Sequence, residues 1–419
     1  MCGGCRRLGL PCDYNSTLIL PARNGNNNST STNAPLSLSS LACSLQPVIT
    51  TLINDRMRLD ESTLNIDARP GQDEILLFDE SDLQRLQYFQ TAICGRGETP
   101  YLFRICRDQV LKLALIVRSP FLSRCIFPTE ISQKSYVMHA VLAFAASHVR
   151  TFHHHGGTKP SQAELFHSQR MLAKYSQKLG GPIPKDDADA MFATTWLLNA
   201  IMFGSIETDR PSDCWPLSLN DSALQWLSIQ RGIRPMMNAT QPWREDSIFK
   251  HSFEAFNDLS EKFVDEQPGR EGLPPQFADL CGITSESTVE NNHYIAPLRT
   301  LIPILGIKCT LENIPRFINF TARIRPGFFE LLQERDPRAL LLLAYWYGIA
   351  CSFDQSWSIQ RAKTECTAIC MFLDNTNDHR IHGLLEYPAR RCGYTLKHRG
   401  AYAYSDDEAD PPFVSCAPM

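Results

Sequence analysis

The sequence predicts an all-α protein, in which a cysteine-bearing head and a low-complexity linker precede one large helical domain. From about Leu76 onward, apolar residues recur at spacings of three and four, the period of an amphipathic helix. Strand patterns with hairpin turns are scarce, and no fixed-period repeat is visible. We therefore divide the chain into a head, a linker, a helical body and an acidic tail, over residues 1–14, 15–75, 76–395 and 396–419.

The expected helices follow one another along the body. A capping residue precedes the first, and Pro120 stops the second. The best marked helix begins at the capping-box pair Ser161 and Glu164 and ends at Gly180. In chain order, helices are expected over residues 79–93, 103–117, 136–149, 161–179, 186–203, 222–231, 246–264, 337–353 and 358–373.

The composition is that of a folded protein with no general affinity for polyanions. Of 419 residues, 43% are hydrophobic and 21% are charged, and the net charge is -4. Residues 1–54 carry +2 and the rest carry -6, so any affinity for nucleic acid has to be local. The longest apolar stretches, residues 136–149 and 339–353, are shorter than the roughly 20 residues that span a bilayer. Fifteen cysteines without a signal peptide favour an intracellular protein with reduced thiols.

The linker has a run of Asn, Ser and Thr over residues 24–33 and too few apolar groups to offset its chain entropy. Some of its apolar residues alternate spacings of three and four, as in a short coiled coil: Leu38, Leu41, Leu45, Val48 and Leu52. Pro47 opposes a helix there. A short dimerising helix and a disordered linker with scattered leucines therefore both stay open.

Cys2, Cys5 and Cys12 have the spacing C-x2-C-x6-C. Two thiolates that are two residues apart can bind one tetrahedral zinc ion, and a third can reach it after a short turn. The flanking Arg6 and Arg7 favour this interpretation over a chance grouping of cysteines. The sequence thus predicts zinc ligands at the three cysteines.

The segment CGGCRRLGLPCDY resembles the second half of the fungal Zn2Cys6 binuclear-cluster DNA-binding domain, in which two C-x2-C-x6-C halves hold two zinc ions. The resemblance implies that Cys2, Cys5 and Cys12 are the fourth, fifth and sixth ligands, with Cys2 bridging the metals. It also implies that Arg6 and Arg7 contact DNA phosphates. Because these residues lack the first half, whose basic helix reads bases in the family, DNA binding is expected to be impaired in the chain as it stands.

Two explanations of the half motif stay open. In the first, Met1 is an internal methionine of a longer protein, and an upstream exon supplies a second C-x2-C-x6-C segment. In the second, the chain is a short form that keeps the body and acts through partners. Translation of the upstream DNA distinguishes them.

Three stretches of the body resemble the regulatory region of fungal Zn2Cys6 factors related to the yeast sterol uptake control proteins. They read LAFAASHV from residue 142, DPRALLLLAYWYGIACSFDQSWSIQ from residue 336 and LLEYPARRCGY from residue 384. The resemblance covers residues 76–395 and implies a nuclear transcription factor whose all-α domain can form a homodimer and bind a sterol or another hydrophobic effector. Other relatives regulate secondary metabolism. No ligand-contact motif aligns, so no ligand-binding residue is transferred.

Other groups of residues receive structural interpretations. The triplet His153 to His155, with His148 and His167 nearby, is assigned to a helix end in preference to a metal site. Cys366 and Cys370 are assigned to core packing in preference to a redox or zinc pair. Asp186, Asp187 and Asp189 are assigned to solvated helix capping in preference to acid–base chemistry. The acidic tail suits either an activation segment or, more simply, a solvated terminus. One aromatic segment suits a lipid-like pocket or, more simply, a core: Leu340 to Leu343, Tyr345, Trp346, Tyr347, Phe353 and Trp357.

Enzyme signatures are missing: the sequence has no phosphate-binding loop, zinc-protease helix, nucleophile elbow or dinucleotide fingerprint. We therefore expect a regulator of RNA polymerase II transcription that is not an enzyme and that binds DNA through a complete zinc cluster. The alternatives are a DNA-independent interaction protein, or a ligand-binding helical domain with a vestigial zinc head.

Overall fold

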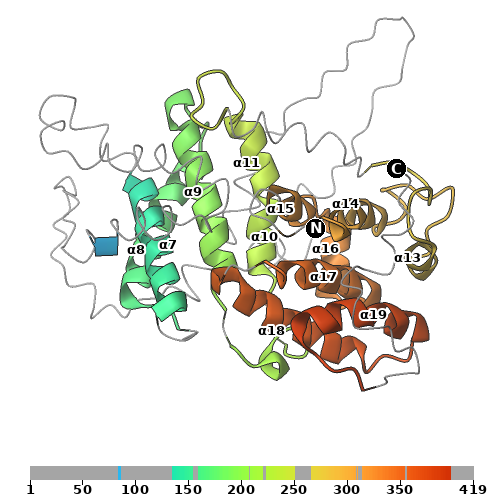
Figure 1. Ribbon diagram of the computed structural model, residues 1–419. Coiled ribbons are helices and arrows are strands. Elements are labelled where there is room, and N and C mark those ends of the chain that lie inside the picture. The colour runs from blue at the N-terminus through green and yellow to red at the C-terminus, as the bar shows by residue number, and fades with distance from the viewer. Residues whose placement is uncertain are drawn as a thin grey trace, which may run out of the picture. The chain divides into compact units, whose positions relative to one another are not determined.

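The computed structural model describes residues 84–85, 135–153, 159–206, 208–219, 223–250, 266–307, 309, 314–353 and 356–397. Within these ranges the chain forms α-helices, a short 3-10 helix and turns, without a β-strand, which confirms the all-α class (Figure 1). The head and the linker lie outside the described residues, as do nearly all of the tail and of the helices expected over residues 79–93 and 103–117. No helix in the described ranges is long and apolar enough to span a membrane.

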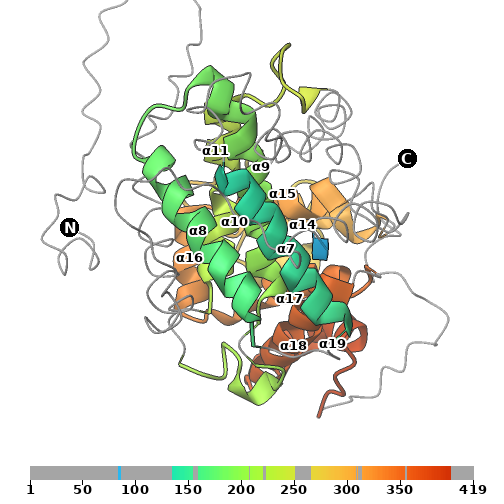
Figure 2. The same cartoon turned by 90° about the vertical axis from the view of Figure 1, so that its left-hand side faces the viewer.

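The first described helices form a packed group. Helix α7 (Ser135–His153) packs against α8 (Gln162–Leu179) and α9 (Lys185–Gly204) (Figure 2). Helix α8 begins as predicted, because Ser161 and Glu164 each accept the other's backbone N–H. The Glu164 carboxylate also accepts hydrogen bonds of 2.9 and 3.1 Å from Arg150 of α7. One buried carboxylate therefore both caps α8 and joins it to α7.

The last described helices form a second group, in which α17 (Pro337–Ala350), α18 (Ser356–Leu373) and α19 (His379–Cys392) pack against one another (Figure 1). Gly348 permits close packing, since an added Cβ would lie 3.3 Å from Tyr387 and 3.4 Å from the backbone of Pro388. Pro388 lies inside α19 and has no N–H to donate to the carbonyl of Leu384. The hydroxyl of Tyr345 donates to that carbonyl instead, at 2.7 Å.

An aromatic cluster connects these groups with the helices between them, which are α10 (Gln225–Arg231), α11 (Ile233–Thr240), α13 (Pro275–Leu280), α14 (Ile295–Leu305), α15 (Ile314–Ala322) and α16 (Pro326–Gln333). Trp346 stacks on Trp226, with ring centroids 5.8 Å apart, and on Phe320, at 6.1 Å. Phe203 meets both tryptophans edge-on. The indole N–H of Trp346 donates to the carbonyl of Phe317 at 2.9 Å. Rings from α9, α10, α15 and α17 thus share one core.

Most expected helices within the described ranges are confirmed, with ends shifted by a few residues. The helix expected over residues 246–264 is wrong at its start, since residues 246–249 form turns and Lys250 is the first helical residue. Asp189 of α9 explains the turns: its carboxylate accepts hydrogen bonds from the Ser247 hydroxyl at 2.8 Å and from the Ile248 N–H at 3.0 Å. A contact distant in sequence overrides the local helical pattern.

The interpretation of residues 186–189 as solvated capping groups is wrong for two of the three aspartates. Asp187 and Asp189 are buried, and Asp187 pairs with Lys178 at 2.7 Å. Asp189 pairs with Arg244, also at 2.7 Å. Both carboxylates anchor other segments to the start of α9, whose N-cap residue gives no side-chain hydrogen bond.

Candidate functional site

The site residues that the sequence predicts lie outside the described residues: Cys2, Cys5, Cys12, Arg6 and Arg7. Their assignment to zinc and to DNA phosphates stays a prediction. Within the body, charged, hydroxyl and thiol side chains gather at a pocket, at a helix cap and at the ends of α18 and α19.

The aromatic segment of α17 forms core, as its simpler interpretation predicts. The side chains from Leu340 to Tyr347 are at most 4% exposed, and Phe353 is 7% exposed. The hydroxyl of Tyr347 donates to Glu365, so the polar atom of this deeply buried ring has a protein partner. Burial raises the pKa of Tyr347 well above its usual value. The described aromatic side chains pack against one another instead of lining a lipid-like cavity.

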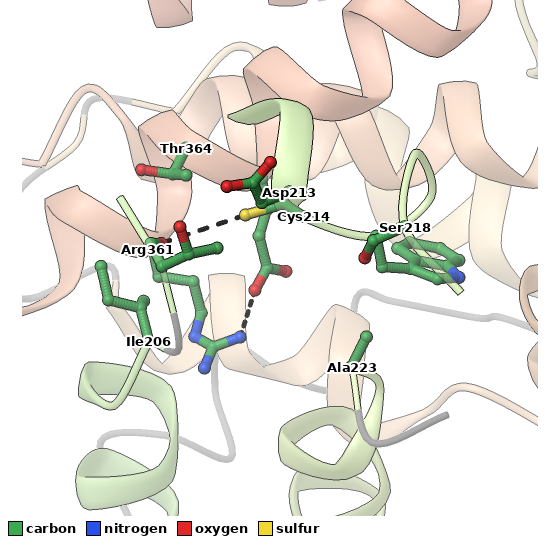
Figure 3. A pocket seen from close by; sticks show the side chains of 10 residues that line it. Ile206, Asp213, Cys214, Ser218, Ala223, Arg361 and Thr364 are labelled. Atoms are coloured by element: carbon green, nitrogen blue, oxygen red, sulfur yellow. Dashed lines mark hydrogen bonds and ion pairs between the residues drawn. The ribbon is translucent and has the colours of Figure 1, made fainter. Parts of the chain in front are cut away.

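A pocket lies between α18 and the segment that includes the 3-10 helix η4 (Pro211–Asp213) (Figure 3). Arg361 and Thr364 come from α18, and Asp213 and Cys214 come from the η4 segment. The cavity volume is about 30 Å³, which is room for one or two water molecules and far below that of a small-molecule site. The pocket is thus a shallow site with many polar groups.

Arg361 is fixed in this pocket by protein groups. It donates hydrogen bonds to the carbonyls of Phe203 at 2.8 Å and Met202 at 3.4 Å, and to the carbonyl of Ser205. Its guanidinium also pairs with Glu365 one turn further along α18. A cation at the carbonyl end of α9 stabilises the helix dipole, so Arg361 has a structural role between α9 and α18.

The chemistry of the pocket follows from its lining. Asp213 and Glu365 supply carboxylates, Thr208 and Thr364 supply hydroxyls, and the lining residues include no histidine. A sterol needs a mainly apolar cavity, which this lining does not provide. The pocket is polar and has room for water, and its Glu365 carboxylate is already paired with Arg361.

Asp336 forms a second charged group at the start of α17. Its carboxylate accepts the N–H of Ala339 at 3.0 Å and the hydroxyl of Tyr294 at 2.8 Å, and it pairs with Arg338 at 3.0 Å. Burial alone would raise the pKa of Asp336, but these hydrogen bonds outweigh it and the pKa is lowered. The group is an N-cap, which stabilises α17.

Three thiols lie together in the second helix group. The sulfur atoms of Cys366, Cys370 and Cys392 all lie within 4.8 Å of one another. Burial raises the pKa of Cys366, whereas hydrogen bonds from Cys366 and Cys370 lower the pKa of Cys392. The two α18 cysteines are buried in the core, as expected, but Cys392 was missed because it belongs to another helix. The signal for it is a concentration of cysteines over residues 351–392.

The histidines do not form a larger group within the described residues. Helix α7 ends at His153, as predicted for a helix end. His167 lies against His139, with 3.0 Å between their Nδ1 atoms, so one ring donates and the other accepts. This pair joins α7 and α8.

The chain has a distant sequence relationship to a known protein. The chain is 22% identical over 275 residues to a Zn(2)-C6 fungal-type transcription factor of Gibberella zeae. The match covers 61% of this chain and 53% of that protein, so the chain spans about half the length of the relative it matches. No protein-family model matches the chain. The body described above is therefore part of a chain distantly related to a fungal zinc-cluster transcription factor.

Proposed function

We propose that this protein is a fungal zinc-cluster transcription factor that acts in the nucleus on genes transcribed by RNA polymerase II. The proposal rests on the joint occurrence of two features in one chain: a C-x2-C-x6-C head, and a distant similarity over 275 residues to a Zn(2)-C6 transcription factor. The motif depends on a few cysteines, whereas the similarity extends over more than half of the chain. The two signals thus support one family by different routes.

In this proposal the head contacts DNA and the helical body regulates. Cys2, Cys5 and Cys12 bind zinc, and Arg6 and Arg7 contact phosphates. The charge distribution supports this division, since residues 1–54 carry +2 and the rest of the chain carries -6. An acidic body is not attracted to a polyanion, so the affinity for DNA has to come from the head.

The head as printed has half of the thiolates that a two-zinc, six-cysteine cluster uses. Zinc binding supplies the folding free energy of so small a module. Specific DNA binding therefore requires a second C-x2-C-x6-C segment, and it is impaired without one. If none is supplied, the alternative is a DNA-independent interaction protein, and the three-thiolate head is the observation that favours it.

The body regulates through a partner, through self-association or through a small effector. Control of sterol or secondary-metabolism genes rests on the resemblance of the body alone. A hydrophobic effector would need a cavity other than the pocket at Arg361, because that pocket presents carboxylates and hydroxyls.

Chromatin occupancy in a fungal host tests the proposal. The gene is expressed from its own locus with a carboxyl-terminal tag, and the occupied DNA is sequenced. We expect nuclear protein at sites that share a short sequence, and we expect Cys5→Ser to abolish the occupancy by removing a zinc ligand. The matched control is Cys281→Ser, which changes a buried cysteine of the body and should leave occupancy unchanged.

A second measurement separates the proposal from its alternative. The purified 419-residue chain and a chain extended by the upstream-encoded cysteine segment are titrated with the selected duplex. Tight, zinc-dependent binding by the extended chain alone is the expected result. Absence of specific binding by both chains, with the helical content intact, would contradict the DNA-binding role and favour the interaction protein.

A further inference from the structure

Thiols from separate helices converge in the C-terminal group. Cys366 and Cys370 are one turn apart on α18, and therefore lie on one face of that helix. Cys392 is the last residue of α19. Their three sulfur atoms lie within 4.8 Å of one another, although the chain between Cys370 and Cys392 includes a turn and a whole helix. The packing of α18 on α19 brings the thiols together.

The spacing of the sulfurs is close to that of a zinc site. A tetrahedral zinc ion with Zn–S bonds of about 2.3 Å holds its sulfurs about 3.8 Å apart. Sulfur pairs at 4.8 Å or less therefore close by about 1 Å at most, a movement that side-chain rotation can supply. The site needs no rearrangement of helices.

A disulfide accounts for this geometry less well. Cys366 and Cys370 project in the same direction from one helix, so a bond between them would distort α18. A bond from Cys392 to either one would leave the third thiol buried beside it. A metal ion uses all three sulfurs at once.

Cys351 supplies a fourth thiol. It follows α17 directly and its thiol lies beside Cys366, although it is outside the set of three whose sulfurs are all within 4.8 Å of one another. With Cys351 included, α18 and the carboxyl ends of α17 and α19 all contribute ligands. Four cysteines in a closed arrangement are typical of structural zinc sites.

The surroundings of Cys392 suit a metal-bound thiolate. Its thiol donates to the carbonyl of Ala389 at 3.5 Å and lies near the side chain of Thr367, a group of the kind that commonly surrounds metal ligands. Cys366 also contacts the carbonyls of Ala344 and Pro388, at 3.6 and 3.7 Å.

We infer that Cys366, Cys370 and Cys392, with Cys351 as fourth ligand, bind a structural zinc ion. Thiolates favour zinc over the harder divalent ions magnesium and calcium. Because the ligands are assembled only when the three helices pack, zinc binding stabilises that packing. The site is separate from the cysteines of the head and does not depend on the function proposed above.

The test uses the full chain with Cys2, Cys5 and Cys12 changed to serine, so that the head cannot contribute. Purified under reducing conditions, this protein should contain about one zinc ion per chain by mass spectrometry of the metal. Its cobalt-substituted form should show thiolate-to-cobalt charge transfer and tetrahedral d–d bands. Adding Cys392→Ala, a change at a half-buried position, should remove the zinc and the bands. The matched control, Cys281→Ala, should retain both.

A chelator experiment guards against a variant that fails to fold. EDTA should lower the melting temperature of the head-serine protein and leave that of its Cys392→Ala derivative unchanged, with both helical by circular dichroism. Cys351→Ala should lower the affinity for zinc, measured by competition with a chromophoric chelator. An unchanged affinity would overturn the four-ligand set. The whole inference is overturned by any of three results: no zinc and no cobalt–thiolate bands, zinc retained by Cys392→Ala, or a Cys392 disulfide in non-reducing peptide maps.

Discussion

The two helix groups of the body are held together by different chemistry. Helices α7 and α8 meet through buried polar groups, since Arg150 pairs with Glu164 at 2.9 Å. Helices α17 and α19 meet through a close backbone approach at Gly348 and through the stacked rings of Tyr345 and Tyr387, whose centroids lie 5.0 Å apart. A buried charge needs its partner, whereas apolar packing responds to volume and shape. The stability of the first group should therefore be most sensitive to the loss of a charge. The stability of the second should be most sensitive to changes in side-chain volume and shape.

The largest expected effect is at the junction between the groups, where Arg361 of α18 holds the end of α9. Arg361→Met should leave Glu365 with an uncompensated charge and free the carbonyls of Phe203 and Ser205. We expect the free energy of unfolding in urea to fall by about 3 to 5 kcal/mol. Arg380→Met, which breaks an exposed pair that solvent screens, is the control and should change the free energy of unfolding far less. Equal effects of the two substitutions would show that the junction is not specially stabilised by Arg361.

The next effect tests the polar character of the first group. Glu164→Gln keeps the shape and a capping acceptor but removes the charge that Arg150 requires. The free energy of unfolding should fall by about 2 to 3 kcal/mol, measured by urea denaturation. In an Arg150→Met background the same change should cost much less, because no buried cation is left unpaired. Additive losses in the double variant would argue against a direct pair.

A smaller effect tests the second group. Tyr345→Phe keeps the stacked ring but leaves the Leu384 carbonyl, already without a helical donor because of Pro388, unpaired. We expect a loss of about 1 to 2 kcal/mol in the free energy of unfolding. Tyr294→Phe, which removes a hydroxyl from the Asp336 carboxylate, provides a comparison at a site where other donors remain. A larger loss there than at Tyr345 would contradict the importance assigned to the Leu384 carbonyl.

The smallest effect is a change in pH dependence. The folded pKa of Asp336 lies below its unfolded value, so its contribution to stability is present above about pH 4 and is lost as pH falls through the folded pKa. Asp336→Asn should therefore flatten the acid limb of stability against pH while retaining a capping side chain. Unfolding curves between about pH 2 and pH 6 measure this, with the exposed Glu330→Gln as control. An unchanged acid limb in Asp336→Asn would contradict the assignment.

The sequence predicted those helix ends that depend on residues close together in the chain. The ends of α8 followed from Ser161, Glu164 and Gly180, because a capping box and a C-terminal glycine act within a few residues. Helices α14 and α19 were not predicted, because each has a proline inside it, and proline ordinarily marks a helix end. The proline of α19 is tolerated because a tertiary contact, the hydroxyl of Tyr345, supplies the hydrogen bond that the helix loses.

The candidate sites of the body were less predictable because their residues come together only through tertiary contacts. The spacing of Cys366 and Cys370 placed both on one face of α18, but nothing local indicated that Cys392 would join them. Asp189 looked like a capping residue because its partners, from Arg244 to Ile248, are more than fifty residues away in the sequence. The head could be interpreted from sequence because its ligands are close together in the chain.

The bonds from Arg361 to the end of α9 also have a consequence for the order of folding. The Arg361 side chain and the Phe203 carbonyl are separated by 158 residues. A ribosome that adds about 5 to 20 residues each second needs on the order of 10 to 30 seconds to make that stretch. During this interval the carbonyl end of α9 has emerged without its cation, and closing so long a loop delays native pairing further. The nascent body should therefore expose the site of its later junction until α18 is made.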